Sequence, residues 1–167
     1  VLYDCFATRM FRTASRMLGS REDAEDVVQD VFLSMVRSHD KLADVRDLTA
    51  YLFTALHRAV GRFASRRARA VPVSPAAVEE AIASTGLPIS GHPDWDRLRK
   101  AIDALPDEQR EVISLKIDGE LTFAQIAQVM GGSISTAASR YQYALKKLRT
   151  SLVGARPSLE RNRLWKT

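Results

Sequence analysis

Apolar side chains recur at intervals of three and four residues along most of this chain of 167 residues. Such spacing places them on one face of an α-helix, because the helix has 3.6 residues per turn. The sequence has no run of β-branched residues that alternates with polar ones, which is the pattern typical of a strand. These two observations predict an all-α fold.

Three helices are predicted in the first 70 residues. The first covers residues 2–18 and ends at Gly19, a residue type favoured at helix C-termini. Ser20, three residues before Asp23, is typical of an N-cap and begins the second helix. The third helix starts at residue 48. The second helix is expected to bury an apolar face of Ala24, Val27, Val28, Val31, Phe32, Met35 and Val36.

Prolines divide the chain into two parts. Four of the six prolines lie between residues 71 and 94, together with three acidic residues and no basic residue. This composition is typical of a linker. We therefore expect two small helical domains over residues 1–70 and 95–153, joined by a flexible linker over residues 71–94 with a short helix at residues 75–84. Residues 154–167 are expected to form a C-terminal tail.

The second domain carries the strongest local signal, a helix-turn-helix over residues 122–149. Thr122 and Gln125 form a capping box, a glycine pair supplies a tight turn, and Ser133 is expected to cap the last helix. Opposite its apolar stripe, the last helix carries polar and cationic side chains that suit base edges and phosphates in the DNA major groove. These are Ser135, Thr136, Ser139, Arg140, Gln142, Tyr143, Lys146 and Lys147. Arg140 is the best candidate for base recognition, because a guanidinium can bind guanine at two positions; the alternative is an ordinary helical hairpin with a solvated basic face.

Apolar spacing and caps also predict the other helices of the second domain. One helix begins near Trp95. Pro106 is expected in the first turn of the next helix, where Asp107 and Glu108 complement the positive end of the helix dipole, and this helix is expected to end at Asp118. The last helix is expected to bury one side, formed by Ile134, Ala137, Tyr141, Leu145, Leu148 and Leu152.

Arginines form a stripe on the third helix, with no acidic residue between Asp47 and Glu79. Their spacing of three and four residues places them on one face, which carries Arg58, Arg62, Arg66 and Arg69. Like charges at this spacing destabilise an isolated helix, and a bound polyanion removes that cost. Tyr51 and Phe53 lie just upstream, and aromatic residues beside a basic stripe suit single-stranded nucleic acid, whose bases stack on them. The alternatives are a core position for Tyr51 and a merely solvated face for the arginines.

The second helix has the opposite charge. Its acidic residues are Glu22, Asp23, Glu25, Asp26 and Asp30. The whole chain has a net charge of +5 and a pI of about 9.7, which favours a polyanionic partner. An acidic face in such a protein indicates a basic protein partner instead. Compensation of the helix dipole is an alternative explanation for Glu22 and Asp23, and helical spacing separates these carboxylates too widely for a metal site.

Catalytic and cofactor motifs are missing from the sequence. The three histidines, His39, His57 and His92, stand in no metal-binding or nucleophile motif, and there is no phosphate-binding glycine loop. We expect no catalytic residue, no metal and no cofactor, and we expect His57 to be a satisfied surface histidine. The single cysteine, Cys5, is expected to be a small buried apolar residue. One cysteine, no secretion signal and no apolar membrane span predict a cytoplasmic protein.

Two stretches of the sequence resemble a known family. The run GSREDAEDVVQDVFLSMVR at residues 19–37 resembles region 2 of bacterial RNA polymerase sigma factors of the extracytoplasmic-function type. The run ALPDEQREVISLKIDGELTFAQIAQVMGGSISTAASRYQYALKKLR at residues 104–149 resembles region 4 of the same proteins. The resemblance covers nearly the whole chain. Family members usually begin one helical segment earlier, so we expect a truncated N-terminal end of region 2.

The resemblance implies a partner for each surface. The acidic helix would bind a basic coiled coil of the β′ subunit of core RNA polymerase through Asp26, Gln29 and Asp30. The loop at residues 42–47 and the third helix would capture the melted strand of the promoter −10 element, through Tyr51, Phe53, Arg58, Arg62 and Arg66. The helix-turn-helix would recognise the −35 element through Ser135, Thr136, Ser139, Arg140, Tyr143, Lys146 and Lys147. Region 4 would also pack on the flap of the β subunit, the acidic linker would run through the nucleic-acid channels of the polymerase, and an anti-sigma factor is a further candidate partner.

The implied function is promoter-specific transcription initiation without a catalytic site in this chain. Two weak DNA-binding domains on a linker bind tightly only when polymerase fixes their spacing, so the free protein is expected to bind promoters weakly. The first alternative is a stand-alone helix-turn-helix regulator with an N-terminal interaction domain. The second is an enzyme with a DNA-binding appendage, such as a recombinase, for which the first 94 residues offer no catalytic constellation.

Overall fold

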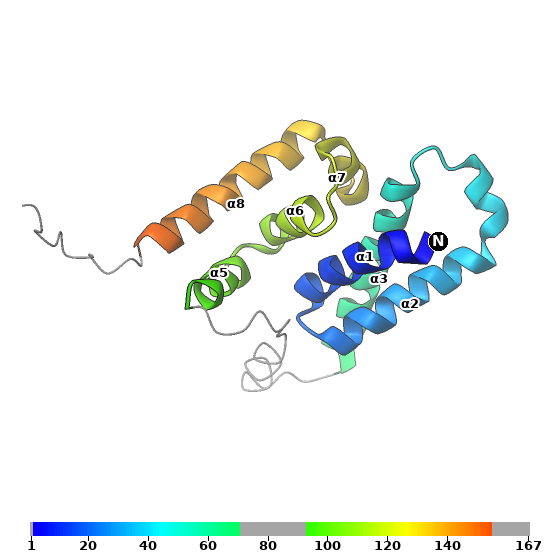
Figure 1. The fold of residues 1–167 in the computed structure, drawn as a ribbon, viewed down its shortest axis with the longest axis horizontal. Coiled ribbons are helices and arrows are strands. Elements are labelled where there is room, and N and C mark those ends of the chain that lie inside the picture. The colour runs from blue at the N-terminus through cyan, green and yellow to red at the C-terminus, as the bar shows by residue number, and fades with distance from the viewer. Residues whose placement is uncertain (1, 71–92, 155–167) are drawn as a thin grey trace, which may run out of the picture.

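The computed structural model describes residues 2–70 and 93–154, and every regular element within these ranges is helical (Figure 1). The predicted all-α class is therefore confirmed. We call residues 2–70 the N-terminal module and residues 93–154 the C-terminal module. The predicted linker helix at residues 75–84 and the predicted tail beyond residue 154 lie outside the described residues.

The N-terminal module is built from helices α1 (Leu2–Leu18), α2 (Arg21–Arg37) and α3 (Leu48–Ala70), with a 3₁₀ segment, η1 (His39–Asp44), before α3. Gly19 ends α1 in the left-handed conformation, with φ of 70°. The hydroxyl of Ser20 accepts a hydrogen bond from the amide of Asp23 at 3.3 Å, which confirms the predicted N-cap of α2. Asp47 caps α3 by accepting from the amide of Ala50 at 2.9 Å.

The C-terminal module contains α5 (Pro93–Asp103), α6 (Asp107–Ile117), α7 (Phe123–Met130) and α8 (Ile134–Gly154). The capping box of Thr122 and Gln125 is present at the start of α7, and Gly131 ends that helix with φ of 68°. Ser133 accepts from the amide of Thr136 at 3.0 Å and so caps α8. Pro106 takes the N-cap position of α6, one residue earlier than predicted. The helix-turn-helix of α7 and α8 therefore forms as its sequence indicates.

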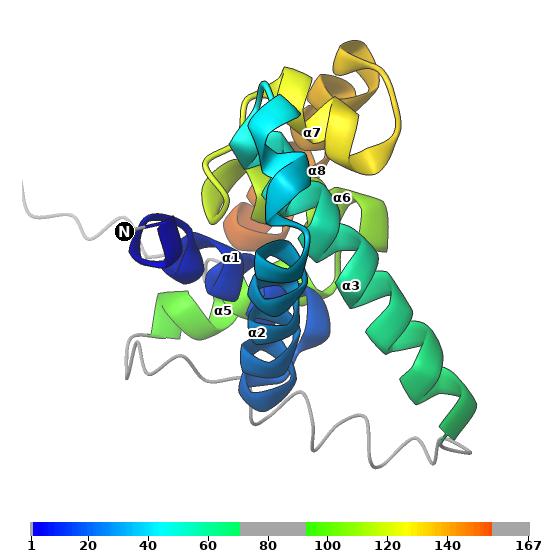
Figure 2. The same ribbon diagram turned by 90° about the vertical axis from the view of Figure 1, so that its right-hand side faces the viewer.

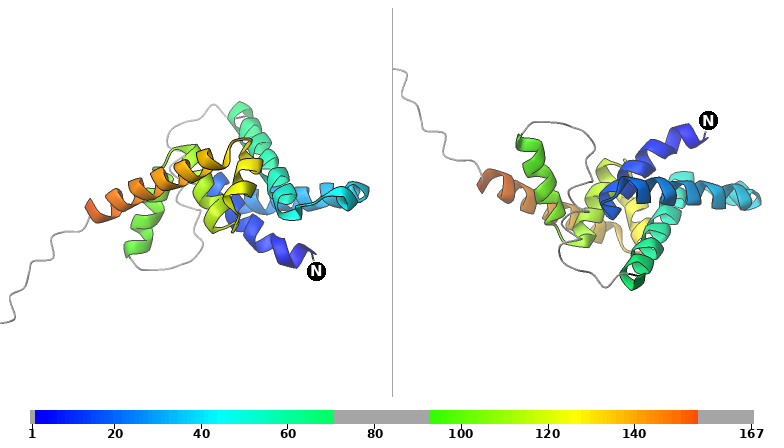
Figure 3. Two further views of the ribbon diagram at one scale, coloured as in Figure 1. Left: turned by 90° about the horizontal axis from the view of Figure 1, so that it is seen from above. Right: turned by 90° about the horizontal axis from the view of Figure 1, so that it is seen from below.

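One apolar core extends across both modules. It joins Leu52 and Leu56 of α3 to Leu115, Leu121 and Ile126 of the C-terminal module. In Figures 2 and 3, α7 packs beside α3 and α6 lies beside α1. A second, smaller cluster belongs to the C-terminal module alone and contains Ile102, Leu105, Ile113, Ala144 and Leu148. The two modules are thus folded onto each other.

Four residues expected in the core are exposed. Ala144 is fully buried while Leu145, about 100° further round α8, is 42% exposed, so the buried stripe of this helix passes through Ala144. Ile134 is 56% exposed because it is the first residue of α8. Val36 is 65% exposed in the last turn of α2, about 100° from the buried Met35. Cys5 is exposed on α1, because the buried side of that helix follows Met10 and Ala14.

Among the helices of residues 2–70 and 93–154, none combines the length and the apolar character that a membrane span needs.

Candidate nucleic-acid and protein interfaces

The acidic face of α2, which we define as Asp26, Gln29 and Asp30, is exposed to solvent. It stays exposed because the opposite side of α2, with Val27, Val28 and Val31, is buried in the core. Leu33 extends this face and is 47% exposed. The sequence analysis overlooked Leu33, although its spacing of three residues from Asp30 and four from Gln29 places it on the same side of the helix. The face therefore combines carboxylates with an apolar contact surface.

A groove of about 740 Å³ lies between α2 and α3. The wall from α3 carries Tyr51 and the arginine stripe, and the wall from α2 includes Asp30 and Ser34. We call this the arginine groove, and its cationic residues are Arg58, Arg62, Arg66 and Arg69. All four are exposed, and Arg66 lies 6.0 Å from the ring centre of Phe63. Tyr51 is half-buried at the end of the stripe, so the structure brings it together with the predicted arginines.

Phe53 lies on a different side of α3. Two residues along a helix correspond to a rotation of about 200°, so Phe53 faces away from Tyr51. Its side chain is fully buried in the core shared by the two modules. The guanidinium of Arg9 lies 5.7 Å from the centre of its ring. The predicted aromatic pair is therefore divided between the arginine groove and the core.

The recognition face of α8 is open to solvent. It consists of Ser135, Thr136, Ser139, Tyr143, Lys146 and Lys147, and each of these residues is exposed. Near its start, Ser133 bonds the hydroxyls of Ser135 and Thr136 at 2.9 and 2.8 Å. These hydroxyls are therefore held together at the N-terminus of the helix, where base contacts are expected.

Arg140 differs from the rest of the predicted DNA-contacting set. Its guanidinium lies 2.7 Å from the carboxylate of Glu108 at the start of α6, and its side chain is 29% exposed. This ion pair directs Arg140 toward α6 rather than away from the module. To contact a base, Arg140 must either break its ion pair with Glu108 or reach the base while that pair stays intact.

His57 bridges the two modules instead of facing the arginine groove. Its Nδ1 bonds the carboxylate of Glu111 in α6. That hydrogen bond raises the pKa of His57, while its partial burial and the nearby Arg58 oppose the rise. The expectation of a satisfied histidine agrees with this contact, although His57 lies between modules and not on an open surface. Among the described residues, no group of three or more histidine, cysteine or acidic side chains is arranged to hold a metal ion.

The two halves of the chain match two regions of one protein family. Residues 2–70 match sigma-70 region 2, and residues 95–148 match sigma-70 region 4. The ECF RNA polymerase sigma factor SigK of Mycobacterium ulcerans is 31% identical over 157 residues, covering 91% of this chain and 84% of the relative. The ECF RNA polymerase sigma factor EcfG of Rhodopseudomonas palustris is 27% identical over 135 residues, covering 81% and 74%.

A solved structure shares the fold. The sigma factor RpoE from Bartonella quintana, in complex with the anti-sigma factor NepR, has a TM-score of 0.61 and 25% sequence identity, covering 90% of this chain and 92% of that one. Its similarity extends over both modules of the present structure. The chain therefore belongs to the sigma-70 family of RNA polymerase sigma factors, in its ECF group.

Proposed function

We propose that this sigma factor directs core RNA polymerase to specific promoters and assists strand opening through three surfaces, of which the acidic face and the arginine groove meet at Asp30. The observation that carries the proposal is that one helical chain presents an acidic face, a basic groove with an aromatic residue, and a polar helix-turn-helix face. These three chemistries fit a basic protein, a single DNA strand and a DNA duplex, respectively. A sigma factor needs all three partners during initiation.

The acidic face of α2 is the proposed docking site for the β′ subunit of core polymerase. Asp26, Gln29 and Asp30 are exposed and have the charge that a basic coiled coil requires. Leu33 adds an apolar patch at one end of the face. An apolar residue beside solvated charges suits an interface in which the charges give orientation and the apolar contact gives affinity.

The arginine groove and the recognition face are the proposed DNA surfaces. Tyr51 can stack on a base of the melted −10 strand, while Arg58, Arg62 and Arg66 meet its phosphates. The recognition face would enter the major groove of the −35 element, with Lys146 and Lys147 on the phosphate backbone.

An anti-sigma factor is a further proposed partner, because the structurally similar RpoE was solved in complex with one. We propose that the chain acts in the cytoplasm, where its polymerase partner works, and that it has no catalytic site of its own. A stand-alone helix-turn-helix regulator would also need the recognition face. It would give no role to the acidic face or to the arginine groove, so we favour the sigma factor.

Run-off transcription tests the proposal directly. Purified chain is added to bacterial core RNA polymerase on a library of genomic promoter fragments, and core polymerase alone serves as the control. We expect transcripts with defined start sites only when the chain is present. No transcripts together with no binding to core polymerase would contradict the proposal and favour the stand-alone regulator.

A further inference from the structure

Arg140 lies at the edge of the recognition face. Around the axis of α8 it is about 40° from the exposed Thr136 on one side and about 40° from the buried Ala144 on the other. Its side chain is 29% exposed, whereas Lys146 and Lys147 are open to solvent. The guanidinium of Arg140 therefore leaves the helix at the boundary between the DNA surface and the core of the module.

The partner of Arg140 belongs to another helix. Nη2 of Arg140 lies 2.7 Å from Oε2 of Glu108, which is in the first turn of α6. The side chain of Glu108 is 68% exposed, so its carboxylate stays in contact with water. A guanidinium has five N–H donors in a planar fork, and one carboxylate can engage at most two of them. Donors remain for a guanine, so a base contact and the ion pair are compatible.

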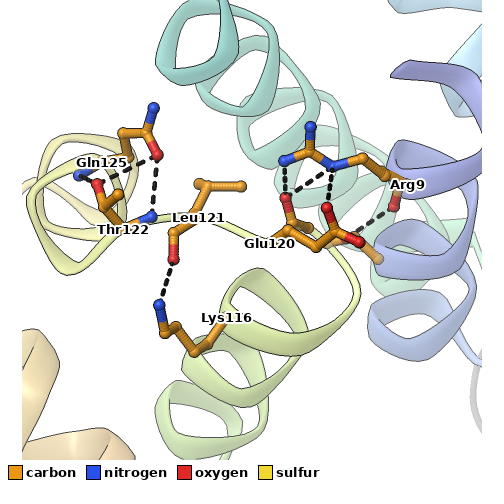
Figure 4. Close-up of polar contacts among 8 residues, drawn as sticks. Arg9, Lys116, Glu120, Leu121, Thr122 and Gln125 are labelled. Atoms are coloured by element: carbon orange, nitrogen blue, oxygen red, sulfur yellow. Dashed lines mark hydrogen bonds and ion pairs between the residues drawn. The ribbon is translucent and has the colours of Figure 1, made fainter. Parts of the chain in front are cut away.

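Helix α6 is fixed relative to the helix-turn-helix. Ile113 of α6 packs with Ala144 and Leu148 of α8 in one apolar cluster. Near the end of α6, Lys116 donates to the carbonyl oxygen of Leu121 at 2.9 Å, beside the capping box that begins α7 (Figure 4). These contacts join α6 to the rest of the helix-turn-helix domain. A carboxylate on α6 can therefore orient a side chain of α8 from a fixed position.

A purely structural role explains this ion pair poorly. The apolar cluster already holds α6 against α8. A pair with one partner largely in water contributes little to folding, because water screens the charges. The same turn of α6 carries a second acidic residue, Asp107, which pairs with Arg110 of the same helix at 2.5 Å. The two neighbouring carboxylates thus differ in their partners, since Asp107 pairs within α6 while Glu108 reaches α8.

A paired guanidinium discriminates between DNA sequences more sharply than a free one. A free arginine at the edge of a groove can turn to the nearest phosphate, which every sequence provides. Glu108 opposes this turn, because the move would break the ion pair and leave an unpaired carboxylate near the negative DNA backbone. A guanine favours the held orientation, since its O6 and N7 accept two donors of the fork. The ion pair therefore lowers the affinity for DNA in general and raises the preference for one base.

Building on the proposed function, we infer that Glu108 is a positioning residue that sets promoter specificity at the −35 element. It holds Arg140 toward a single guanine and keeps it away from the phosphate backbone. Glu108 acts only through Arg140. A determinant of base preference thus lies on α6, outside the helix that is proposed to enter the major groove.

Competitive transcription tests this inference in the complete initiation complex. Core polymerase with the full chain transcribes a promoter pool whose −35 element is randomised, and sequencing of the transcripts gives the preference at each base pair. Arg140→Ala should reduce the preference at one base pair roughly tenfold, because it removes a bidentate base contact. Glu108→Gln should reduce the preference at the same base pair about threefold and leave the others unchanged.

Two further variants separate the contact from its charge. Asp107→Asn is the matched control, because it also removes one negative charge from the first turn of α6 but leaves the pair with α8 intact. It should not change the base preference. The double variant Arg140→Ala with Glu108→Gln should match Arg140→Ala alone, since the two residues act as one unit.

Binding of duplex DNA by the free chain gives an independent readout. A random-sequence duplex at low salt measures the general affinity of the chain for DNA. Glu108→Gln should bind it severalfold more tightly than Asp107→Asn, because the released Arg140 can meet a phosphate. The salt dependence should become steeper by about one phosphate contact. A variant that had merely lost structure would bind less tightly.

Two transcription results would overturn the inference. One is an unchanged base preference in Glu108→Gln. The other is an equally large effect of Glu108→Gln in the Arg140→Ala background, which would mean that Glu108 contacts DNA directly. If the wild-type chain gives no transcripts, the proposed function fails, and the duplex series still decides the role of Glu108. Equal binding by Glu108→Gln and Asp107→Asn would then contradict it.

Discussion

Helices α3 and α8 both carry sequence patterns typical of nucleic-acid binding, but the exposure of the predicted residues differs between the two helices. The predicted residues of α8 are exposed together, except for Arg140, which pairs with Glu108. On α3 the predicted set is divided, because Tyr51 lines the arginine groove while Phe53 is buried beneath the C-terminal module. A pattern along one helix predicts which residues share a side of it. It does not predict which side another module will cover.

The largest expected effect is a difference in stability between substitutions at the two aromatic residues of α3. Phe53→Ala removes a fully buried ring from the shared core and should lower the free energy of unfolding by about 3–5 kcal/mol. Tyr51→Ala should cost much less, because Tyr51 is half-buried and lines an open groove. Urea unfolding of both variants measures the difference. An equal loss of unfolding free energy in the two variants would contradict the claim that Phe53 belongs to the core while Tyr51 lines the groove.

Polymerase binding should depend strongly on the acidic face. A double variant with Asp26→Lys and Asp30→Lys should weaken binding to core polymerase more than tenfold, because it places like charges against a basic partner. The free energy of unfolding should change little, since both residues are exposed. The control is the double variant Asp96→Lys with Asp103→Lys, because both residues are exposed on α5 and the variant makes the same change in net charge. Titration against labelled core polymerase measures the affinity of the wild-type chain and of both variants. Equal loss of affinity in the control would reduce the acidic face to a general charge effect.

Promoter choice should depend on Arg140 and on its partner. Loss of a base contact by Arg140→Ala should reduce discrimination between promoters by about 1–3 kcal/mol and leave core binding intact. Glu108→Gln removes the carboxylate that holds Arg140 and should alter discrimination less. Competitive transcription from two promoters measures both effects and their coupling. If Arg140→Ala changed only the unfolding free energy, Arg140 would be a structural residue of the C-terminal module.

The smallest expected effect is a pH dependence of the contact between the modules at His57. The carboxylate of Glu111 raises the pKa of His57 above 6.5, so protonated His57 favours this contact. This contribution is fully present below pH 6.5 and is lost as the pH rises through the raised pKa. The free energy of unfolding, measured in urea, should therefore fall slightly as the pH rises above 6.5. His57→Gln should flatten this response, and an unchanged response in that variant would assign it to other groups.

Local features of the fold were predictable from the sequence to a high degree. Three helix starts are each specified by a hydrogen bond to a neighbour three residues away, at Ser20, at Thr122 with Gln125, and at Ser133. Residue type and position in the sequence predict each of them. The sides of α2 and α8 were predicted less well at Val36 and Leu145. A single turn of a helix holds too few apolar residues to fix the centre of its buried stripe.

The contact between the modules was not predictable from the sequence. Arg16 of α1 forms an ion pair with Asp118, with Nε 2.5 Å from the carboxylate. The two residues are far apart along the chain, and neither stands in a motif that predicts a partner. The burial of Phe53 depends on Gly119, whose missing side chain makes room for the ring. Such long-range complementarity has no periodic signature, so it becomes visible only when both modules are seen together.

The most direct test of the account is run-off transcription by variants of two proposed surfaces, with binding to core polymerase measured on the same proteins. We predict that the double variant Asp26→Lys with Asp30→Lys loses both core binding and transcription, because it alters the acidic face. The double variant Arg58→Glu with Arg62→Glu should bind core polymerase normally but produce no transcripts, because it alters only the arginine groove. Equal loss of core binding in the two variants would contradict the claim that the acidic face and the arginine groove have different partners.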